Sequence, residues 1–269
     1  SSAAAPQDDR ARCYERSRSD PGGMSRRRPR RSRPLWPLLL CVASCGAGES
    51  VESLLADSFD YANASYWDQR YAKQAGSNFE WYGLTWGILN ATLRPHMHIG
   101  HRILHLGTGN SPLPEEMYHD GYRQQVACDI SSMVIEQMRG KWAHLEPDLE
   151  FKVEDALRSG FDSASFDVVL EKGTMEAVGS SRDCALEEDG CELLAAEKEL
   201  ILEAFRLLRP GGVFVSIADE LRPFPEWQGR GLARIERAEL TEKDGIPVPK
   251  TIYLCFKATV DATTAVEEL

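Results

Sequence analysis

The chain has 269 residues, of which 42% are hydrophobic and 27% charged, so it can bury a sizeable core and is not disordered as a whole. Its charge is uneven: residues 1–50 hold ten arginines and five acids, whereas residues 51–269 hold 21 basic and 37 acidic side chains, a net charge of −16. This acidic part repels phosphate backbones, which disfavours nucleic acid as the main partner and favours a basic protein surface.

We expect residues 1–50 to form a disordered or targeting extension, because they lack apolar periodicity. Met24 is a candidate start, followed by a basic block over 26–33 and an apolar run over 35–43. That order is similar to a secretory signal, and the run is too short to span a bilayer. The arginines also fit a mitochondrial presequence, although prolines interrupt an amphipathic helix. The predicted location is cytoplasmic, or the secretory pathway or mitochondrion if residues 24–48 are a targeting signal.

Beyond the extension, strand-like and helix-like stretches alternate, which predicts an α/β domain over 51–260 and a tail over 261–269. Parallel strands are predicted over 103–106, 125–129, 149–153, 166–170 and 213–218. Helices are predicted over 114–120, with Ser111 as cap and Gly121 as stop, from Ser131 or Ser132 onward, and over 193–208 before Arg209-Pro-Gly-Gly212. The runs 232–240 and 251–256, joined by Asp244-Gly245, predict an antiparallel pair at the sheet edge.

The seven cysteines do not predict a disulfide framework in a domain of this size. Cys128 and Cys255 lie in strand-like runs, where buried thiols are expected, and Cys184 and Cys191 would pair only in an oxidising compartment. Four histidines, at 96, 98, 101 and 105, lie before or within the first strand. A loop that runs into a strand seldom lets such side chains converge, so no metal site is predicted.

The most informative motif is the apolar strand 103–106, which runs into the turn Gly107-Thr-Gly109. Two glycines let the backbone turn tightly and approach a ligand closely. Asp129 follows twenty residues after Gly109, at the end of the next apolar run, where a carboxylate can accept both ribose hydroxyls. A dinucleotide site needs a third glycine where this chain has Pro112. The predicted ligand has a ribose and no pyrophosphate, which fits S-adenosylmethionine.

Five blocks in the right order resemble the class I S-adenosylmethionine-dependent methyltransferases, and among them the methyltransferase-like family that modifies lysines on translation elongation factor 1-alpha. The blocks are Tyr66-Trp-Asp-Gln-Arg-Tyr71, Phe79-Glu-Trp-Tyr-Gly83, Leu106-Gly-Thr-Gly-Asn-Ser111, Asp129-Ile-Ser-Ser132 and Ser165-Phe-Asp-Val-Val-Leu-Glu-Lys-Gly-Thr174. The resemblance implies a Rossmann-like seven-stranded sheet with helices on both faces and an antiparallel edge strand. Relatives with similar blocks methylate other proteins, including a mitochondrial citrate synthase, so the blocks define the cofactor more closely than the substrate.

The same resemblance implies a set of cofactor-binding residues. These are Trp67, Tyr71 and Trp81 around the methionine end, Gly107 and Gly109 at the floor, Asp129 at the ribose, Ile130 on the adenine, Asp155 and Ala156 at the adenine edge, and Lys172 beside the fourth strand. Arg70 is the implied cation for the methionine carboxylate. The alternative roles are lid or core aromatics for the three rings, a turn cap for Asp155 and a surface acid for Asp129.

Three positions depart from the family pattern. Thr108 stands where the family usually has Cys, and His105 stands where many class I enzymes carry an acid. Glu176 stands where the acid is usually Asp, one methylene shorter. These changes leave the cofactor assignment intact and put the substrate geometry near the fourth strand in doubt.

The expected chemistry explains why the sequence shows no acid–base dyad. A sulfonium methyl is already activated, so transfer needs alignment and a dry pocket more than a strong base. A free lysine side chain has a pKa of about 10.4, so at neutral pH its ammonium form outnumbers the neutral amine about a thousandfold. Forming the reactive neutral amine therefore costs about 4 kcal/mol. Desolvation beside Trp81 and Tyr82 would lower that pKa, whereas a carboxylate at Glu171 would raise it. We therefore interpret Glu171 as a positioning group and assign no catalytic base.

These observations predict a protein-lysine N-methyltransferase that acts on translation elongation factor 1-alpha or a similar basic protein. A small-molecule methyltransferase and a cofactor-free scaffold on the methyltransferase fold are the alternatives. Nucleic-acid base methylation is disfavoured, because the fourth strand is followed by Glu171-Lys-Gly-Thr174 and not by an Asn/Asp-Pro-Pro-aromatic element.

Overall fold

The computed structural model describes residues 61, 63–74, 76–179, 195–218, 232–240 and 250–259. The predicted extension over 1–50, the tail over 261–269, the turn at Asp244-Gly245 and the pair Cys184 and Cys191 lie outside these residues. Within the described part of the chain, no helix is both long enough and apolar enough to cross a bilayer.

The described strands form one seven-stranded sheet in the order β3-β2-β1-β4-β5-β7-β6. They are β1 (Arg102–Leu106), β2 (Gln124–Asp129), β3 (Leu149–Val153), β4 (Phe166–Lys172), β5 (Leu208–Ala218), β6 (Leu232–Leu240) and β7 (Lys250–Lys257). Strands β1 to β5 run parallel, and β7 pairs antiparallel with both β5 and β6, which confirms the predicted edge pair. Because β1 lies between β2 and β4, the strand order reverses at its carboxyl end, where open α/β sheets bind ligands.

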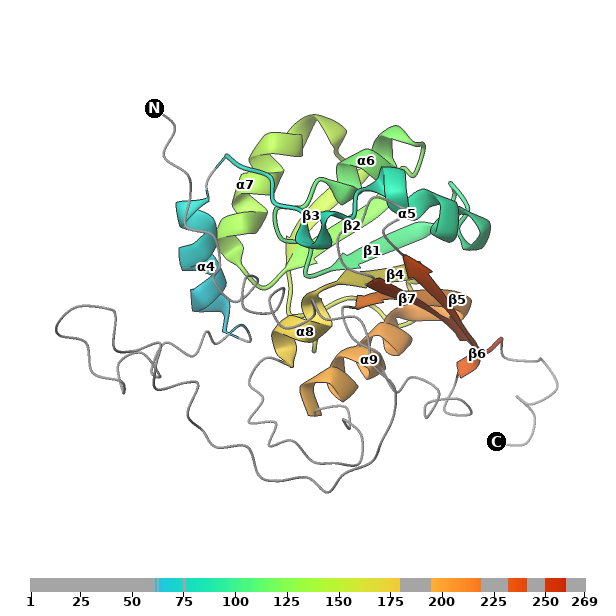
Figure 1. Cartoon of the computed structure of the whole chain (residues 1–269). Helices are drawn as coiled ribbons and strands as arrows, with labels where there is room; N and C mark the ends of the chain where they lie inside the picture. Colours follow the sequence, from blue (N-terminus) through green and yellow to red (C-terminus); the bar gives the residue numbers. More distant parts are fainter. Residues whose placement is uncertain are drawn as a thin grey trace, which may run out of the picture. The chain divides into compact units, whose positions relative to one another are not determined.

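Helices cover both faces of the sheet, as predicted (Figure 1). They are α4 (Ala64–Lys73), α5 (Trp86–Leu93), α6 (Leu113–His119), α7 (Ser132–Trp142), α8 (Thr174–Val178) and α9 (Ala195–Leu207), with short 3-10 turns η2 (Trp81–Gly83), η3 (Arg94–His96) and η4 (Ala143–Leu145). The predicted cap at Ser131 is confirmed, because its hydroxyl accepts a hydrogen bond from the Val134 amide at the start of α7. The predicted cap at Ser111 is wrong by one residue: Pro112 is the N-cap of α6, and the Ser111 hydroxyl accepts a hydrogen bond from the Leu113 amide just before that helix.

Side chains alternate along each strand, and this alternation divides the core between the two faces. Leu104 and Leu106 of β1 pack with the apolar side of α9, which includes Leu200 and Ile201. Ile103, on the other face of the same strand, packs with α5 and α6. Figure 1 shows α5, α6 and α7 together on one side of the sheet and α9 on the other. His105 shares the face of Ile103 and therefore points beneath the glycine turn.

The predicted fifth strand over 213–218 begins earlier in the structure, because β5 starts at Leu208 and includes the segment 209–212. The register between β4 and β5 shifts between Phe166 and Val168, so this glycine-rich stretch forms a bulge in the parallel pair. A Cβ on Gly212 would lie 2.8 Å from the carbonyl oxygen of Asp167, which only glycine permits. Gly212 therefore permits a close backbone approach inside a strand.

Candidate functional site

The glycine turn after β1 is closely packed at both glycines. Gly107 and Gly109 have φ values of +64° and +54°, in the left-handed region that favours glycine. A Cβ on Gly107 would lie 2.2 Å from Oγ1 of Thr174, and one on Gly109 would lie 2.7 Å from the Tyr71 hydroxyl oxygen. The Thr174 hydroxyl donates a 2.8 Å hydrogen bond to the Leu106 carbonyl. Backbone conformation and space both require glycine at these two positions.

Asp129, at the end of β2, supports the turn from below. Its Oδ2 accepts a 2.9 Å hydrogen bond from the Gly109 amide, and its Oδ1 accepts a 3.0 Å bond from the Ser131 amide. Burial raises the pKa of Asp129 to about 6, against the opposing effect of these amide donors. A carboxylate accepts about four hydrogen bonds, so capacity remains for hydroxyl donors of a ligand. Asp129 is buried and is therefore not a surface acid.

The three predicted aromatic residues come together beside this turn. Trp67 and Tyr71 lie one helical turn apart on α4, and their rings stack with centroids 5.7 Å apart. The Trp81 ring meets the Trp67 ring edge to face at 6.4 Å. The guanidinium carbon of Arg70 lies 5.0 Å from the centre of the Trp81 ring, and this arginine also donates to the Tyr66 hydroxyl at 3.2 Å. Arg70 is thus held against the aromatic cluster.

Lys172, at the end of β4, has a protein partner that the sequence analysis did not single out. Its ammonium forms an ion pair with the Glu80 carboxylate, and the side chains are 5% and 13% exposed. Glu80 also accepts a 2.6 Å hydrogen bond from the Ser111 hydroxyl. Burial raises the pKa of Glu80 and lowers the pKa of Lys172, while each charge favours the ionised form of the other. The pair joins the segment before η2 to the turn and to β4.

Glu171 points to the opposite face of β4, as expected for the neighbour of Lys172 on a strand. Its Oε2 accepts hydrogen bonds from the Thr174 and Met175 amides at 3.1 Å each, and its Oε1 accepts one from the Ser216 hydroxyl. Glu171 is fully buried. It therefore holds the start of α8 against β5, which differs from a role in positioning the substrate amine.

The remaining predicted residues follow β2 and β3. Ile130 is half-buried directly after Asp129, and the Glu154 amide donates a 3.0 Å hydrogen bond to the Asp129 carbonyl, which brings the end of β3 beside it. Asp155 is exposed and its Oδ1 accepts a 2.8 Å bond from the Leu157 amide, so it does cap a turn. Ala156 is buried.

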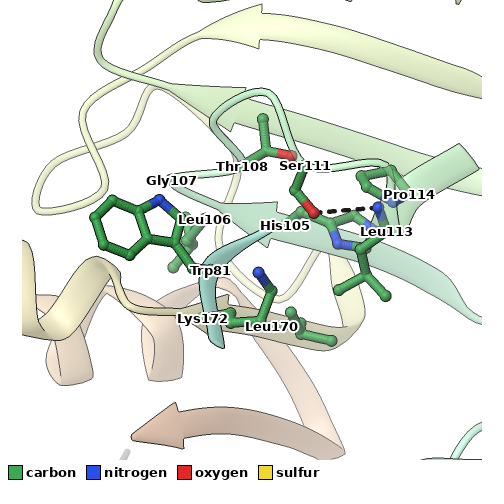
Figure 2. A pocket seen from close by; sticks show the side chains of 10 residues that line it. All are labelled: Trp81, His105, Leu106, Gly107, Thr108, Ser111, Leu113, Pro114, Leu170 and Lys172. Atoms are coloured by element: carbon green, nitrogen blue, oxygen red, sulfur yellow. Dashed lines mark hydrogen bonds between the residues drawn. The ribbon is translucent and has the colours of Figure 1, made fainter. Parts of the chain in front are cut away.

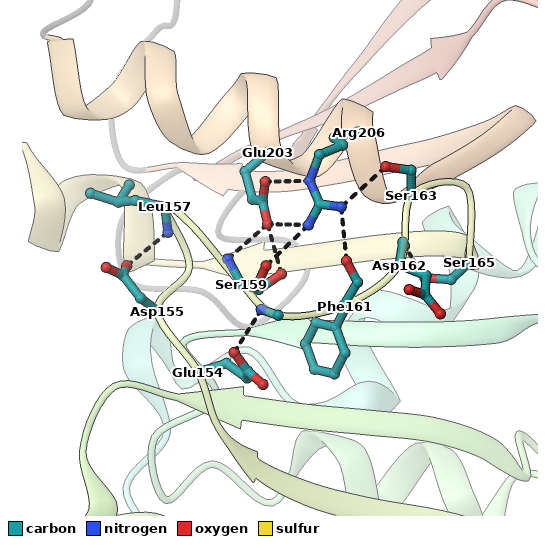
Figure 3. A network of polar contacts seen from close by, with 11 residues as sticks. Glu154, Asp155, Leu157, Ser159, Phe161, Asp162, Ser163, Ser165, Glu203 and Arg206 are labelled. Carbon is teal, nitrogen blue, oxygen red and sulfur yellow. Dashed lines mark hydrogen bonds and ion pairs between the residues drawn. The ribbon is translucent and has the colours of Figure 1, made fainter.

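The loop that carries Asp155 and Ala156 is anchored to α9 (Figure 3). The Arg206 guanidinium donates to the carbonyls of Ser159 and Phe161 at 3.2 and 2.8 Å. Glu203 pairs with Arg206 at 2.8 Å and accepts a 2.8 Å bond from the Ser159 amide. Two residues of one helix thus hold both sides of the loop, and nothing in the loop sequence itself signals this anchor.

A small pocket lies beneath the turn on the α5–α6 face (Figure 2). It is lined by Trp81, His105, Leu106, Gly107, Thr108, Ser111, Leu113, Pro114, Leu170 and Lys172. Figure 2 shows Thr108 and Ser111 on one wall, with Lys172 and Leu170 facing them and Trp81 at the side. The pocket therefore joins the turn, the end of β4 and the aromatic cluster.

His105 is a neutral, structurally engaged side chain in this pocket. Both amide hydrogens of Gln125 are donated to the carbonyls of Pro114 and Tyr122, so its oxygen accepts the 2.7 Å bond from Nε2 of His105. Burial lowers the pKa of His105 to about 4, and the nearby Lys172 charge acts in the same direction. Among the residues the structure describes, no three His, Cys, Asp or Glu side chains are grouped as metal ligands.

Comparison with known proteins identifies relatives of this chain. Residues 98–241 match the family model described as a methyltransferase domain. The chain is 37% identical to the eEF1A lysine and N-terminal methyltransferase of Danio rerio over 161 residues, which are 59% of this chain and 21% of that protein. It is 37% identical to EEF1A lysine methyltransferase 4 of Mus musculus over 179 residues, which are 65% of this chain and 68% of that protein.

The solved structure of the CurJ carbon methyltransferase shares the fold, with a TM-score of 0.50 and 15% identity over 75% of this chain and 60% of that chain. The sequence matches thus span about a fifth of the fish relative and about two thirds of the mouse relative.

The ion pair between Glu80 and Lys172 generates a prediction about stability. Glu80→Gln would leave a buried ammonium without its carboxylate, so the free energy of unfolding should fall by about 3 kcal/mol. Lys172→Met in the same chain should recover part of this loss. Urea denaturation measures both. The matched control is Glu150→Gln, which breaks the half-exposed pair with Lys152 and should cost less than about 1 kcal/mol. Equal losses in the two single variants would contradict the prediction.

Proposed function

The chain belongs to the methyltransferase-domain family, and from this membership we propose that it is an S-adenosylmethionine-dependent protein-lysine N-methyltransferase acting on translation elongation factor 1-alpha or a similar basic protein. The 37% identity to the mouse EEF1A lysine methyltransferase 4, over 65% of this chain, carries the proposal. The net charge of −16 over residues 51–269 supports a basic protein partner over nucleic acid.

The cofactor site follows from the residues at the strand-order reversal. Those proposed to contact it are Trp67, Tyr71, Trp81, Gly107, Gly109, Asp129, Ile130, Asp155, Ala156 and Lys172. The acceptor capacity of Asp129 suits ribose hydroxyls, and the left-handed conformation of Gly107 and Gly109 lets the chain turn tightly beside that carboxylate. The aromatic cluster and Arg70 suit an end that carries a sulfonium and a carboxylate.

The chain's own contribution to catalysis is that it keeps two buried carboxylates, Glu80 and Glu171, bonded to its own donors. The bound cofactor supplies a methyl group already activated on sulfur. Glu80 is engaged by Lys172 and Ser111, and Glu171 is engaged at the start of α8, so neither stabilises an incoming ammonium. Burial beside Trp81 lowers the pKa of the substrate amine. With the cofactor bound, the neutral amine would form the N–C bond as the C–S bond broke, and its proton would pass to solvent.

Purified elongation factor 1-alpha should therefore accept a radiolabelled methyl group from the cofactor in the presence of this protein. Transfer should weaken as salt rises, because long-range attraction between the acidic enzyme and a basic substrate is screened. It should rise toward alkaline pH and vanish when the acceptor lysine is changed to arginine, which stays protonated. Mass spectrometry of the substrate locates the methylated residue.

Asp129→Ala is the inactive control for this assay. Label that survives protease digestion of a lysate, or that is found only in low-mass material, would favour the small-molecule alternative. Label in base-treated nucleic acid would favour a nucleic-acid substrate. A protein that binds no cofactor at all would favour the scaffold alternative.

The raised pKa of Asp129 predicts how cofactor binding varies with pH. The free carboxyl titrates at about 6, and ribose hydroxyls would lower its pKa in the complex, because they stabilise the charged form. Below about pH 6 the carboxyl must release a proton before the ligand binds. Affinity for S-adenosylhomocysteine should be constant above about pH 7 and fall by up to tenfold per pH unit below about 6. Titration calorimetry measures both the affinity and the released proton.

Asp129→Asn is the matched control, because it keeps the shape and removes the titration. It should weaken binding by about 2 to 4 kcal/mol at pH 7.5 and flatten the acid limb. An acid limb that persists in this variant would assign the titration to another group.

We also propose that residues 1–50 lie outside the catalytic domain and that the protein is cytoplasmic. A chain that begins at Glu52 should keep full methyl transfer and an unchanged melting temperature, because every recognised block lies beyond it. A large loss of either would mean that the arginine-rich segment packs on the domain or recruits the substrate. Import of a reporter fused to residues 24–48 into mitochondria or the secretory pathway would contradict the proposed location.

A further inference from the structure

Asp68 joins α4 to the start of α7 through two hydrogen bonds. Its Oδ1 accepts a 2.6 Å bond from the Ser131 hydroxyl and a 3.2 Å bond from the Met133 amide. The first turn of a helix leaves amide donors without partners inside the helix, and the helix dipole stabilises a carboxylate there. Ser131 is itself the N-cap of α7, and its hydroxyl oxygen accepts from the Val134 amide. Asp68 therefore completes the cap of α7 from a different helix.

α4 and α7 lie side by side and meet again one turn further along α4 (Figure 1). The Gln137 side-chain amide donates a 3.1 Å hydrogen bond to the Tyr71 carbonyl. Tyr71 and Trp67 also pack on the apolar cluster that includes Val134 and Ile135 of α7. Hydrogen bonds and apolar packing together determine which face of α4 meets α7, and therefore where the other side chains of α4 point.

The side chains that α4 brings to the proposed cofactor site lie on either side of Asp68. Trp67 precedes it, Tyr71 follows it by one turn, and the Arg70 guanidinium lies 5.5 Å from the centre of the Trp67 ring. The Tyr71 hydroxyl also reaches the glycine turn, where it would lie 2.7 Å from a Cβ on Gly109. A change in how α4 docks would therefore move the aromatic side of the site.

The charge of Asp68 acts in the opposite direction on the nearby acid of β2. Burial is the main cause of the raised pKa of Asp129, and the Asp68 charge raises that pKa further. Removing this charge would favour the ionised form of Asp129, which is the form that best accepts ribose hydroxyls. A loss of affinity on removing the Asp68 carboxylate would therefore come from its hydrogen bonds and not from its charge.

We propose that Asp68 is a positioning residue, which docks α4 on the start of α7 and thereby holds the methionine end of the cofactor site in place. Asp68 acts through Trp67 and Tyr71, the α4 residues proposed to contact the cofactor. The docking does not depend on the proposed function, whereas its effect on cofactor binding rests on it.

The docking is tested without any ligand. Asp68→Ala removes both hydrogen bonds, so the amides of α4 should exchange with deuterium about tenfold faster, as measured by mass spectrometry. Asp68→Asn keeps the Oδ1 acceptor and should retain the protection of the wild-type protein. Exchange in β1 and β4 should be the same in all three proteins, which shows that each is folded. Unchanged protection of α4 in Asp68→Ala would overturn the proposal.

The effect on the cofactor site is tested with two ligands in titration calorimetry. S-adenosylhomocysteine carries the amino-acid end, and 5′-methylthioadenosine has the nucleoside without it. Asp68→Ala should weaken S-adenosylhomocysteine about tenfold and change the affinity for 5′-methylthioadenosine less than about twofold. Asp68→Asn should restore the affinity. Equal loss of both ligands would mean that Asp68 acts through Ser131 on the ribose acid, and would overturn the assignment to α4.

Asn63→Ala is the matched control, because it removes the N-cap of α4 and leaves the bonds of Asp68 to α7 in place. It should change the affinity for S-adenosylhomocysteine less than about twofold. A loss as large as that of Asp68→Ala would mean that the stability of α4, and not its docking, governs the site. If the wild-type protein binds neither ligand, the proposed function fails, and hydrogen exchange alone then decides the docking.

Discussion

The hydrogen bonds that Asp129 accepts from the Gly109 and Ser131 amides are the constraint on which the site depends. One buried carboxylate sets the second glycine of the turn and the start of α7 at once. A side chain at Gly109 would collide with the Tyr71 hydroxyl. The glycine therefore allows α4, which carries Tyr71, to pack against the turn. Burial of Asp129 opposes its ionisation, and ligand hydroxyls would relieve that cost. The glycine turn, the starts of the neighbouring helices and the Asp129 carboxylate thus form one structural unit.

The ion pair between Glu80 and Lys172 fixes the segment before η2 against the end of β4. A desolvated pair contributes little net stability compared with apolar residues of the same volume, whereas each partner alone is costly. Its consequence is geometric: the segment that carries Trp81 is tied to β4 and, through Ser111, to the turn. The aromatic wall of the pocket is therefore positioned by charge as well as by ring contacts.

The sequence predicted the strands, the glycine turn after β1 and the cap at Ser131 well, because each of these depends on local pattern. The periodicity of 103–106 and the Gly107-Thr-Gly109 turn are local, and so is the cap at Ser131. The partners Glu80 and Arg206 were missed because each acts on a segment distant in sequence. The sequence did offer one indication of the role of Glu80, because it is the single acid within the aromatic block 79–83. No comparable signal marked Arg206, whose targets are backbone carbonyls and carry no side-chain pattern.

Negative charge would have opposite effects on the proposed reaction at long range and at the reacting amine. A net charge of −16 over residues 51–269 would attract the proposed basic substrate across several ångströms of solvent, within the Debye length of about 8 Å at physiological salt. The same sign at the reacting amine would stabilise the ammonium and stop the chemistry. The structure separates the two demands, because Glu80 and Glu171 are buried and bonded to the chain's own donors. Acidity can therefore serve encounter on the surface without protonating the nucleophile inside.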